Sequence, residues 1–150
     1  RKRRPLEKDG INYFFLSTAE FKSKIRNNDF LEWEEVYQNQ FYGTLKTSAN
    51  QLLKSGYNVL FDVDVRGALS IKRYFKDRSR TIFIKPSSVV TAKKRLIDRE
   101  TESKHQLEKR ISKMENELKF ATKMDHMVIN DVLADSKSEI YHYVKDFLSS

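Results

Sequence analysis

The chain has 150 residues, which is enough for one compact domain with a substantial core and too few for two independent ones. Lysine and arginine outnumber aspartate and glutamate by 29 to 21, and the net charge of +8 indicates an anionic partner such as a nucleotide, a nucleic acid or a membrane surface. No cysteine is present, which excludes disulfides and thiol chemistry. Because the sequence also lacks an apolar run of membrane-spanning length, we expect a cytoplasmic protein.

Residues 11–44 predict a small mixed lobe with short elements and frequent turns. Ser17 and Glu20 have the spacing of a capping box, so a helix should begin there, and a second helix should end near Gly56. Between them, residues 30–44 (FLEWEEVYQNQFYGT) predict two short strands that carry three glutamates. Acidic residues in this stretch of a basic chain need a chemical explanation.

Three nearly continuous apolar runs, at residues 58–63, 81–86 and 126–131, predict buried strands. Such runs are typical of parallel strands that are covered on both faces. Helical patterns follow at residues 67–75, 88–97, 104–122 and 136–148. The alternation predicts an α/β fold with a doubly wound parallel sheet.

Polar residues end each apolar run. Asp62 and Asp64 end the first, Lys85 ends the second, and Asn130 and Asp131 end the third. Ligands of open parallel sheets bind beyond the carboxyl ends of the strands, so these residues are candidates for a site. Acids here could instead cap the following helices. For the residues of the third run both interpretations stay open, whereas the stiff strand before the two aspartates favours a site.

Arg95, Arg99 and Arg110 form a second candidate cluster, with the first two on one helical face. Guanidinium groups suit phosphate oxygens and could neutralise a phosphoryl group in transfer. A solvated charged face is the competing interpretation, and the spacing alone favours it.

A third set of candidates lies in the small lobe. Its arginine and tyrosine donors suit a phosphate, whereas Glu32 is an acceptor that a phosphate would repel. The set therefore implies a ligand with a phosphate and a donor-rich end, such as the N1–H and exocyclic amine of guanine. Glu32 could instead pair with a lysine across the strands, and Tyr42 could belong to the core. The members are Arg1, Arg4, Tyr13, Glu32, Tyr42 and Thr44.

The motifs in their order resemble those of the guanylate kinases over essentially the whole chain. They are DGINYFF, FLEWEEVY, FYGT, VLFDVDVRGA, KKRLIDRETES and VIND, with Arg110 at the place of a further family arginine. The resemblance implies a P-loop-kinase-like α/β fold whose doubly wound parallel sheet lacks its first strand. It also implies a single domain with a GMP-binding lobe at residues 1–45, core at 46–91, a helical lid at 92–112 and core at 113–150.

The resemblance further implies transfer of the γ-phosphoryl group of ATP to GMP, with Mg²⁺ near Asp62 through water. Proteins that catalyse such transfers mainly position the reactants and offset charge. The implied partners are GMP and ATP, and neither nucleic acid nor a membrane. The implied phosphate contacts of GMP are Arg1, Arg4, Tyr13 and Tyr42; the guanine contacts are Glu32, Thr44 and Asp64; the catalytic arginines are Arg95, Arg99 and Arg110; and Asn130 lies near the ATP base.

The sequence departs from the family most clearly by containing no G-x-x-x-x-G-K-[ST] phosphate loop. The family places this loop ahead of Arg1, so we expect the chain by itself to have negligible kinase activity. We also expect an open sheet edge at which chains could associate or exchange strands. Asp98 and Glu100 add negative charge to the lid, and Arg66 replaces a glutamine that is usual in the family.

Two alternatives to an active kinase remain. Members of the family that have lost catalysis act as protein-interaction modules, and a chain without the phosphate loop fits that description. The retained lid arginines and the aspartate pair favour an enzyme. Sequence-independent binding of nucleic acid depends on the net charge alone.

Overall fold

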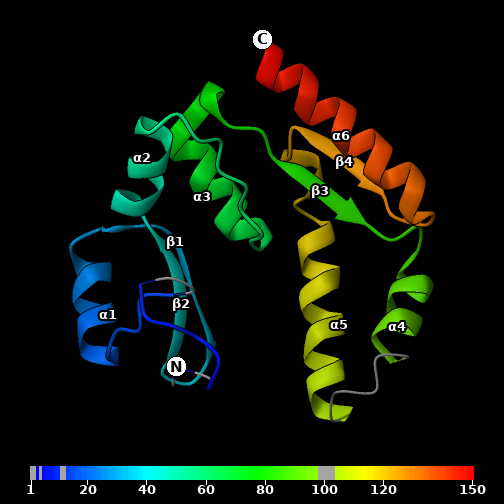
Figure 1. Cartoon of the computed structure of the whole chain (residues 1–150). Helices are drawn as coiled ribbons and strands as arrows, with labels where there is room; N and C mark the ends of the chain where they lie inside the picture. The colour runs from blue at the N-terminus through cyan, green and yellow to red at the C-terminus, as the bar shows by residue number, and fades with distance from the viewer. Residues whose placement is uncertain (1–2, 4, 11–12, 98–103) are drawn as a thin grey trace. The chain divides into compact units, whose positions relative to one another are not determined.

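The computed structural model describes residues 3, 5–10, 13–97 and 104–150, which carry the colours of the bar in Figure 1. The chain divides into two compact units, Arg1–Tyr74 and Phe75–Ser150. Within the described residues each unit contains one two-stranded sheet. None of the described helices is both long and apolar enough to cross a membrane.

The first helix, α1 (Thr18–Arg26), begins at the predicted capping box. The Ser17 hydroxyl accepts a hydrogen bond from the Glu20 backbone N–H at 3.2 Å, and the Glu20 carboxylate accepts one from the Ser17 N–H at 2.7 Å. These bonds satisfy backbone N–H groups that have no partner inside the helix. The predicted start of this helix is therefore confirmed.

The strands β1 (Phe30–Tyr37) and β2 (Gln40–Leu45) form an antiparallel hairpin, which confirms the two short strands predicted there. One face of the hairpin packs on α1. There Phe21 stacks on Phe30 and Phe41, with ring centroids 4.3 Å and 5.3 Å apart. These aromatic rings form the apolar core of the lobe and leave the other face of the hairpin available for polar side chains.

Gly43 lies opposite Trp33 in the hairpin. A Cβ atom at Gly43 would lie 2.7 Å from the Glu32 carbonyl oxygen and 2.9 Å from Trp33 Cβ, which is closer than non-bonded atoms approach. The two strands can pair at this point because residue 43 has no side chain.

Two helices complete the first unit, α2 (Lys46–Lys54) and α3 (Val65–Phe75). The first of them ends just before Gly56, whose φ of +82° suits glycine at a helix end, as the sequence predicted. The helices contact each other through a 3.0 Å hydrogen bond from the Asn50 side-chain amide to the Tyr74 hydroxyl. The helix α3 begins two residues earlier than predicted.

The strand predicted at residues 58–63 is not formed. Residues 57–64 have no strand pairing within the part of the chain that the structure describes, and Leu60 is 95% exposed. An apolar run becomes a strand only when a neighbouring strand satisfies its backbone N–H and C=O groups. The sheet of this unit is the β1–β2 hairpin, which does not extend to these residues. The prediction from hydrophobicity was therefore wrong for this run.

The second unit contains the parallel pair β3 (Ile82–Lys85) and β4 (His126–Ile129). Parallel strands need a long crossover, and here it includes α4 (Val89–Ile97) and α5 (Lys104–Leu118), which contact each other. Both strands were predicted from their apolar runs. This strand, helix and parallel strand order confirms the predicted α/β class.

The last helix, α6 (Leu133–Ser149), runs along β4 in the second unit (Figure 1). It begins three residues earlier than predicted, since the Ser136 N–H already donates to the Val132 carbonyl oxygen at 3.1 Å as in a helix. Val128 of β4 is fully buried, whereas Met127 and Ile129, on the other face of the same strand, are exposed. Side chains of the second unit therefore cover one face of β4 more completely than the other.

A hydrogen-bonded cluster joins the starts of the two parallel strands. The Asp125 carboxylate accepts hydrogen bonds from the backbone N–H and the hydroxyl of Thr81, both at 2.8 Å. The Asp125 N–H in turn donates to the Thr81 hydroxyl at 3.0 Å. Thr81 is buried, so these bonds satisfy its polar groups and support the register of β3 and β4.

Candidate functional site

An irregularity in the hairpin register turns Glu32 away from the aromatic core. Between Phe30 and Glu32 the pairing with β2 shifts by one residue, so the two side chains point to opposite faces although they are two positions apart. Glu32 pairs with Thr44 and Glu34 with Tyr42 on this second face. The hairpin thus has an aromatic face on α1 and a polar face that carries the predicted GMP contacts.

Glu32 is half-buried on the polar face, where its Oε1 accepts a hydrogen bond from the Thr44 hydroxyl at 2.6 Å. Burial is the main cause that raises the pKa of Glu32. The Thr44 hydrogen bond lowers this pKa in part, whereas the negative charges of Asp64 and Glu34 raise it further. A ligand with N–H donors would therefore stabilise the ionised form of Glu32.

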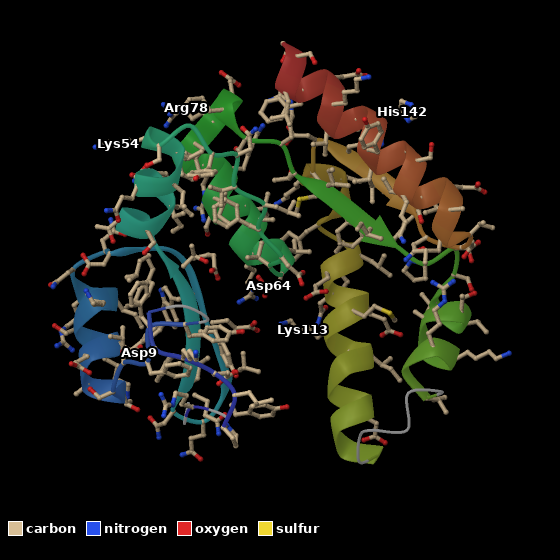
Figure 2. The ribbon with its side chains drawn as sticks, viewed as in Figure 1. Asp9, Lys54, Asp64, Arg78, Lys113 and His142 are labelled. Atoms are coloured by element: carbon tan, nitrogen blue, oxygen red, sulfur yellow. The ribbon has the colours of Figure 1, made fainter. Side chains whose placement is uncertain are left out.

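Asp64 brings a second carboxylate to the same place from the start of α3 (Figure 2). Its Oδ1 accepts a hydrogen bond from the Gly67 N–H at 2.8 Å, as a helix cap does. The sequence favoured a site role for this aspartate over a helix cap. The structure shows the cap, and the cap holds the carboxylate near Glu32.

Tyr13 and Tyr42 lie together next to this acidic pair. Their ring centroids are 6.4 Å apart in an edge-to-face arrangement, and Tyr42 is two residues before Thr44 on the polar face. Tyr42 does not belong to the aromatic core, which lies on the opposite face of the hairpin. The cross-strand partner of Glu32 is a threonine, so the proposed lysine partner is also wrong.

The first unit therefore brings together most of the predicted GMP contacts, which come from β1, β2, the start of α3 and the segment before α1. Arg1 and Arg4, the other two predicted contacts, lie outside the described residues. The contacts brought together are Tyr13, Glu32, Tyr42, Thr44 and Asp64.

Two residues of this site are not identified by the motifs as ligand contacts. Glu34 lies opposite Tyr42 and adds its negative charge to the surroundings of Glu32. Gly67 packs against both Glu32 and Asp64. The period of two in a strand could have placed Glu34 beside Glu32, whereas the contact of Gly67 with β1 depends on the tertiary fold.

Asp62 is exposed in the extended segment before α3. The described residues contain no group of three or more side chains that could hold a metal ion. A carboxylate is a ligand type that Mg²⁺ accepts, and Mg²⁺ in nucleotide sites keeps several waters and phosphate ligands. Asp62 therefore fits a water-mediated contact with a nucleotide-bound Mg²⁺, and it does not form a protein-only metal site with its described neighbours.

The second unit brings Arg95 and Asn130 together at the carboxyl ends of its strands. The Arg95 guanidinium donates to the Asn130 carbonyl oxygen at 2.6 Å, and lies 3.9 Å from the Asp131 carboxylate. The Asp131 carboxylate also accepts a hydrogen bond from the Ser87 N–H at 3.3 Å. These bonds connect α4, the loop after β3 and the loop after β4, where ligands of parallel sheets bind.

The side chain of Asn130 accepts a hydrogen bond from the Ser136 hydroxyl at 3.1 Å, so it also stabilises the start of α6. The side chains of the other two predicted catalytic arginines lie outside the described part of the structure. Arg99 lies outside the described residues. Arg110 belongs to α5, but its side chain is not among those described.

Known proteins are similar to this sequence over most of its length. The sequence matches the family model described as guanylate kinase over residues 1–150. It is 47% identical over 142 residues to the guanylate kinase of Bacteroides fragilis, covering 95% of this chain and 70% of that protein. The guanylate kinase of Salinibacter ruber is 41% identical over 150 residues, which cover 100% of this chain and 79% of that protein.

The fold is also similar to that of a solved structure. The crystal structure of guanylate kinase from Anaplasma phagocytophilum matches with a TM-score of 0.72 at 22% identity, covering 97% of this chain and 70% of that one. At this sequence identity the structural similarity shows the fold alone, whereas the sequence matches show the family. This chain belongs to the guanylate kinase family.

Proposed function

We propose that this chain provides the GMP-binding and lid parts of an enzyme that transfers the γ-phosphoryl group of ATP to GMP, giving ADP and GDP. The observation that carries the proposal is the polar face of the β1–β2 hairpin. There the Glu32 carboxylate, oriented by Thr44, lies near Asp64 and beside the Tyr13–Tyr42 pair. The face combines acceptors for a base with donors for a phosphate, which is the combination that GMP requires.

Recognition of guanine depends on the ionised, half-buried carboxylate of Glu32. The N1–H and exocyclic N–H groups of guanine donate to a carboxylate, whereas adenine presents an unprotonated N1 at that edge. Because Glu32 is half-buried, a base that does not donate would leave its charge poorly solvated. Sites that use buried hydrogen bonds in this way reject analogues strongly, so we expect AMP to bind far more weakly than GMP.

Phosphate recognition is assigned to the hydroxyl groups of Tyr13 and Tyr42, together with Arg1 and Arg4. Tyrosine hydroxyls donate single hydrogen bonds, and arginines donate in pairs to phosphate oxygens. The edge-to-face contact of the two tyrosine rings restricts their rotation and so fixes where the hydroxyls can point.

The phosphoryl-transfer step is assigned to Arg95, Arg99 and Arg110, which would neutralise charge on the transferring group. The hydrogen bond from Arg95 to the Asn130 carbonyl holds α4 beside the predicted ATP-base contact. When Mg²⁺ is bound with ATP, it offsets phosphate charge, and Asp62 would contact its waters.

The 150 residues contain no phosphate-loop motif, so we propose that they bind GMP without catalysing transfer when assayed alone. The extended segment at residues 58–63 forms no strand within the described residues and includes Leu60, which is 95% exposed, and we propose that it supports association between chains. A monodisperse monomer in light scattering would contradict the association. The absence of cysteine suits a reducing compartment such as the cytoplasm.

Calorimetric titration with GMP, AMP and GDP tests the proposal. We expect a GMP dissociation constant between about 1 μM and about 1 mM, and no measurable AMP binding at the same concentrations. Equal binding of GMP and AMP, or binding of neither, would contradict base recognition and leave a protein-interaction role as the better reading. The matched variant Glu32→Gln separates recognition of the base from simple attraction of an anion to a basic chain.

A further inference from the structure

The first turn of α3 contains a glycine that packs between the two carboxylates of the site. The Gly67 N–H donates to Asp64 at 2.8 Å. A Cβ atom at Gly67 would lie 3.2 Å from Val63 Cβ, 3.3 Å from the Asp64 carboxylate and 3.4 Å from Glu32 Cγ. The distances to Val63 and Asp64 are tighter than ordinary van der Waals contacts and that to Glu32 is at their lower limit, so neighbours would have to shift by a few tenths of an ångström.

The backbone does not explain the glycine. Gly10 and Gly56 are the glycines with positive φ among the described residues, so Gly67 has a backbone conformation that other residues adopt freely. Glycine also weakens a helix relative to alanine. The feature that requires glycine here is space, because the residue is buried against β1.

A methyl group at this position has few ways to be accommodated. Glu32 is held on its other side by the Thr44 hydroxyl, and Asp64 is held by the Gly67 N–H itself. Moving either carboxylate changes the distance between the two acceptors. Guanine offers three N–H donors, one on N1 and two on the exocyclic amine, and a single carboxylate accepts two of them in parallel. The third is available to a second acceptor.

We propose that Gly67 is a positioning residue for base selectivity, which sets the spacing of Glu32 and Asp64 so that both acidic side chains reach the donors of guanine. This inference rests on the proposed function, because it assumes that the polar face binds GMP. Gly67 does not touch the ligand and acts through its two neighbours. Inosine monophosphate, which keeps N1–H and lacks the exocyclic amine, has no donor for the second carboxylate. Correct spacing therefore favours GMP over inosine monophosphate.

The test compares the full chain with its Gly67→Ala and Gly67→Ser variants by calorimetry with GMP and with inosine monophosphate, and by thermal unfolding. We expect Gly67→Ala to weaken GMP binding about 10-fold, because small displacements at a recognition site are costly. Gly67→Ser should weaken it more. The affinity for inosine monophosphate should change by less than about 3-fold, so the GMP preference falls. The melting temperature should change only slightly, because the higher helix propensity of alanine offsets part of the crowding that its methyl group introduces.

Ser70→Ala is the matched control, because it is another small substitution toward alanine in α3, and its hydroxyl accepts a hydrogen bond from Arg73. It should leave the GMP preference unchanged. If the unaltered chain binds GMP, and Gly67→Ala binds each nucleotide as tightly as the unaltered chain does or weakens both by the same factor, then Gly67 does not set selectivity. The inference is then overturned while the proposed function stands. If the unaltered chain shows no GMP preference over AMP, the proposed function and this inference are both overturned.

A second pair of variants tests the same role if Gly67→Ala does not fold. Asp64→Ser and Asp64→Ala both remove the carboxylate that would face the base, but serine can still accept the Gly67 N–H as a helix cap. The remaining GMP affinity should be about 3-fold to 10-fold higher in Asp64→Ser, because Gly67 then stays in place beside Glu32. Equal affinities in the two variants would show that the position of Gly67 does not affect the site.

Discussion

At the scale of single residues, Glu32 illustrates how a site for binding lowers the stability of the fold. Burial raises the pKa of Glu32, so the folded chain binds this proton more tightly than the unfolded chain does. As the pH rises from the ordinary glutamate range through the raised pKa, ionisation of Glu32 therefore reduces the free energy of unfolding. At neutral pH the ionised Glu32 therefore lowers the free energy of unfolding, and the N–H donors of bound GMP would offset this loss.

Glu32→Gln should therefore raise the melting temperature at neutral pH while removing GMP recognition. We expect GMP binding to weaken by about 10-fold to 150-fold, the factor for losing hydrogen bonds to a charged group. The gain in melting temperature should shrink as the pH falls through the raised pKa of Glu32, because the parent chain then takes up this proton. Thermal unfolding at several pH values and calorimetry give the two results.

Glu108→Gln is the matched control for this prediction, because Glu108 is exposed on α5. It should change neither the melting temperature nor the GMP affinity. A Glu32→Gln variant that is less stable than the parent at neutral pH would contradict the link between burial of this carboxylate and stability.

At the scale of elements, the hairpin depends on the absence of a side chain at Gly43. A Cβ atom there would lie 2.7 Å from the Glu32 carbonyl oxygen, and this atom belongs to the backbone, which cannot rotate away. We expect Gly43→Ala to lower the free energy of unfolding by about 2–4 kcal/mol and to weaken GMP binding, because β1 must separate from β2 beside Glu32. Denaturant unfolding and calorimetry measure the two effects.

Gly56→Ala serves as the comparison for Gly43→Ala. Its φ is +82°, but a Cβ atom at Gly56 would meet nothing within 4 Å. The cost should be the backbone strain alone, about 1 kcal/mol, with GMP affinity retained. Equal losses for both glycine variants would mean that close approach of the strands is not what Gly43 provides.

The cluster at the starts of β3 and β4 makes a prediction for the second unit. Asp125→Ala removes the acceptor for the buried Thr81 N–H and hydroxyl. We expect a loss of about 2–3 kcal/mol in the free energy of unfolding, since a buried donor is left without its partner. Asp146→Ala, an exposed position on α6, should be close to neutral in the same denaturation experiment.

Several elements could be predicted from local sequence. The capping box of Ser17 and Glu20 placed the start of α1, and the apolar runs placed β3 and β4. The run at residues 58–63 is equally apolar, yet it forms no strand within the described residues, because strand formation depends on a partner elsewhere in the chain. Hydrophobicity predicts which segments tend to be buried and does not identify the neighbour that buries them.

The same limit applies to the candidate site. The motifs identified Glu32, Thr44 and Asp64, which do lie together. They gave no indication that a register shift turns Glu32 away from the Phe30 face, because a strict period of two would place both side chains together. Contacts between α3 and β1 are also nonlocal, and so Gly67 could not be identified as part of the site.

At the scale of the whole molecule, two compact units divide the residues implied for the two nucleotides. The first unit contains the described GMP contacts, and the second contains Arg95 and Asn130. The chain spans 70% of the Bacteroides fragilis guanylate kinase and 79% of that from Salinibacter ruber. In the proposed function, binding of GMP depends on the first unit, whereas transfer also needs a cradle for the ATP phosphates.

The 150-residue chain assayed alone should therefore bind GMP and produce ADP from ATP and GMP at a rate at least about 1,000-fold below that of an intact family member, since no phosphate-loop amides or lysine are present to hold the β and γ phosphates. A coupled ADP assay with saturating nucleotides measures the rate. Turnover within about 10-fold of an intact enzyme would contradict the expectation that transfer requires a phosphate loop.

The hydrogen bond that the Gly67 N–H donates to Asp64 links a backbone amide of α3 to the proposed guanine-binding residues. The same short turn both caps α3 and forms part of the site, so fraying of the helix end and opening of the site are one local event. A nucleotide that binds only the closed form must suppress this opening in proportion to its occupancy. Amide hydrogen exchange at Gly67 and Ala68, whose N–H groups both donate to Asp64, would therefore measure base binding from within the helix.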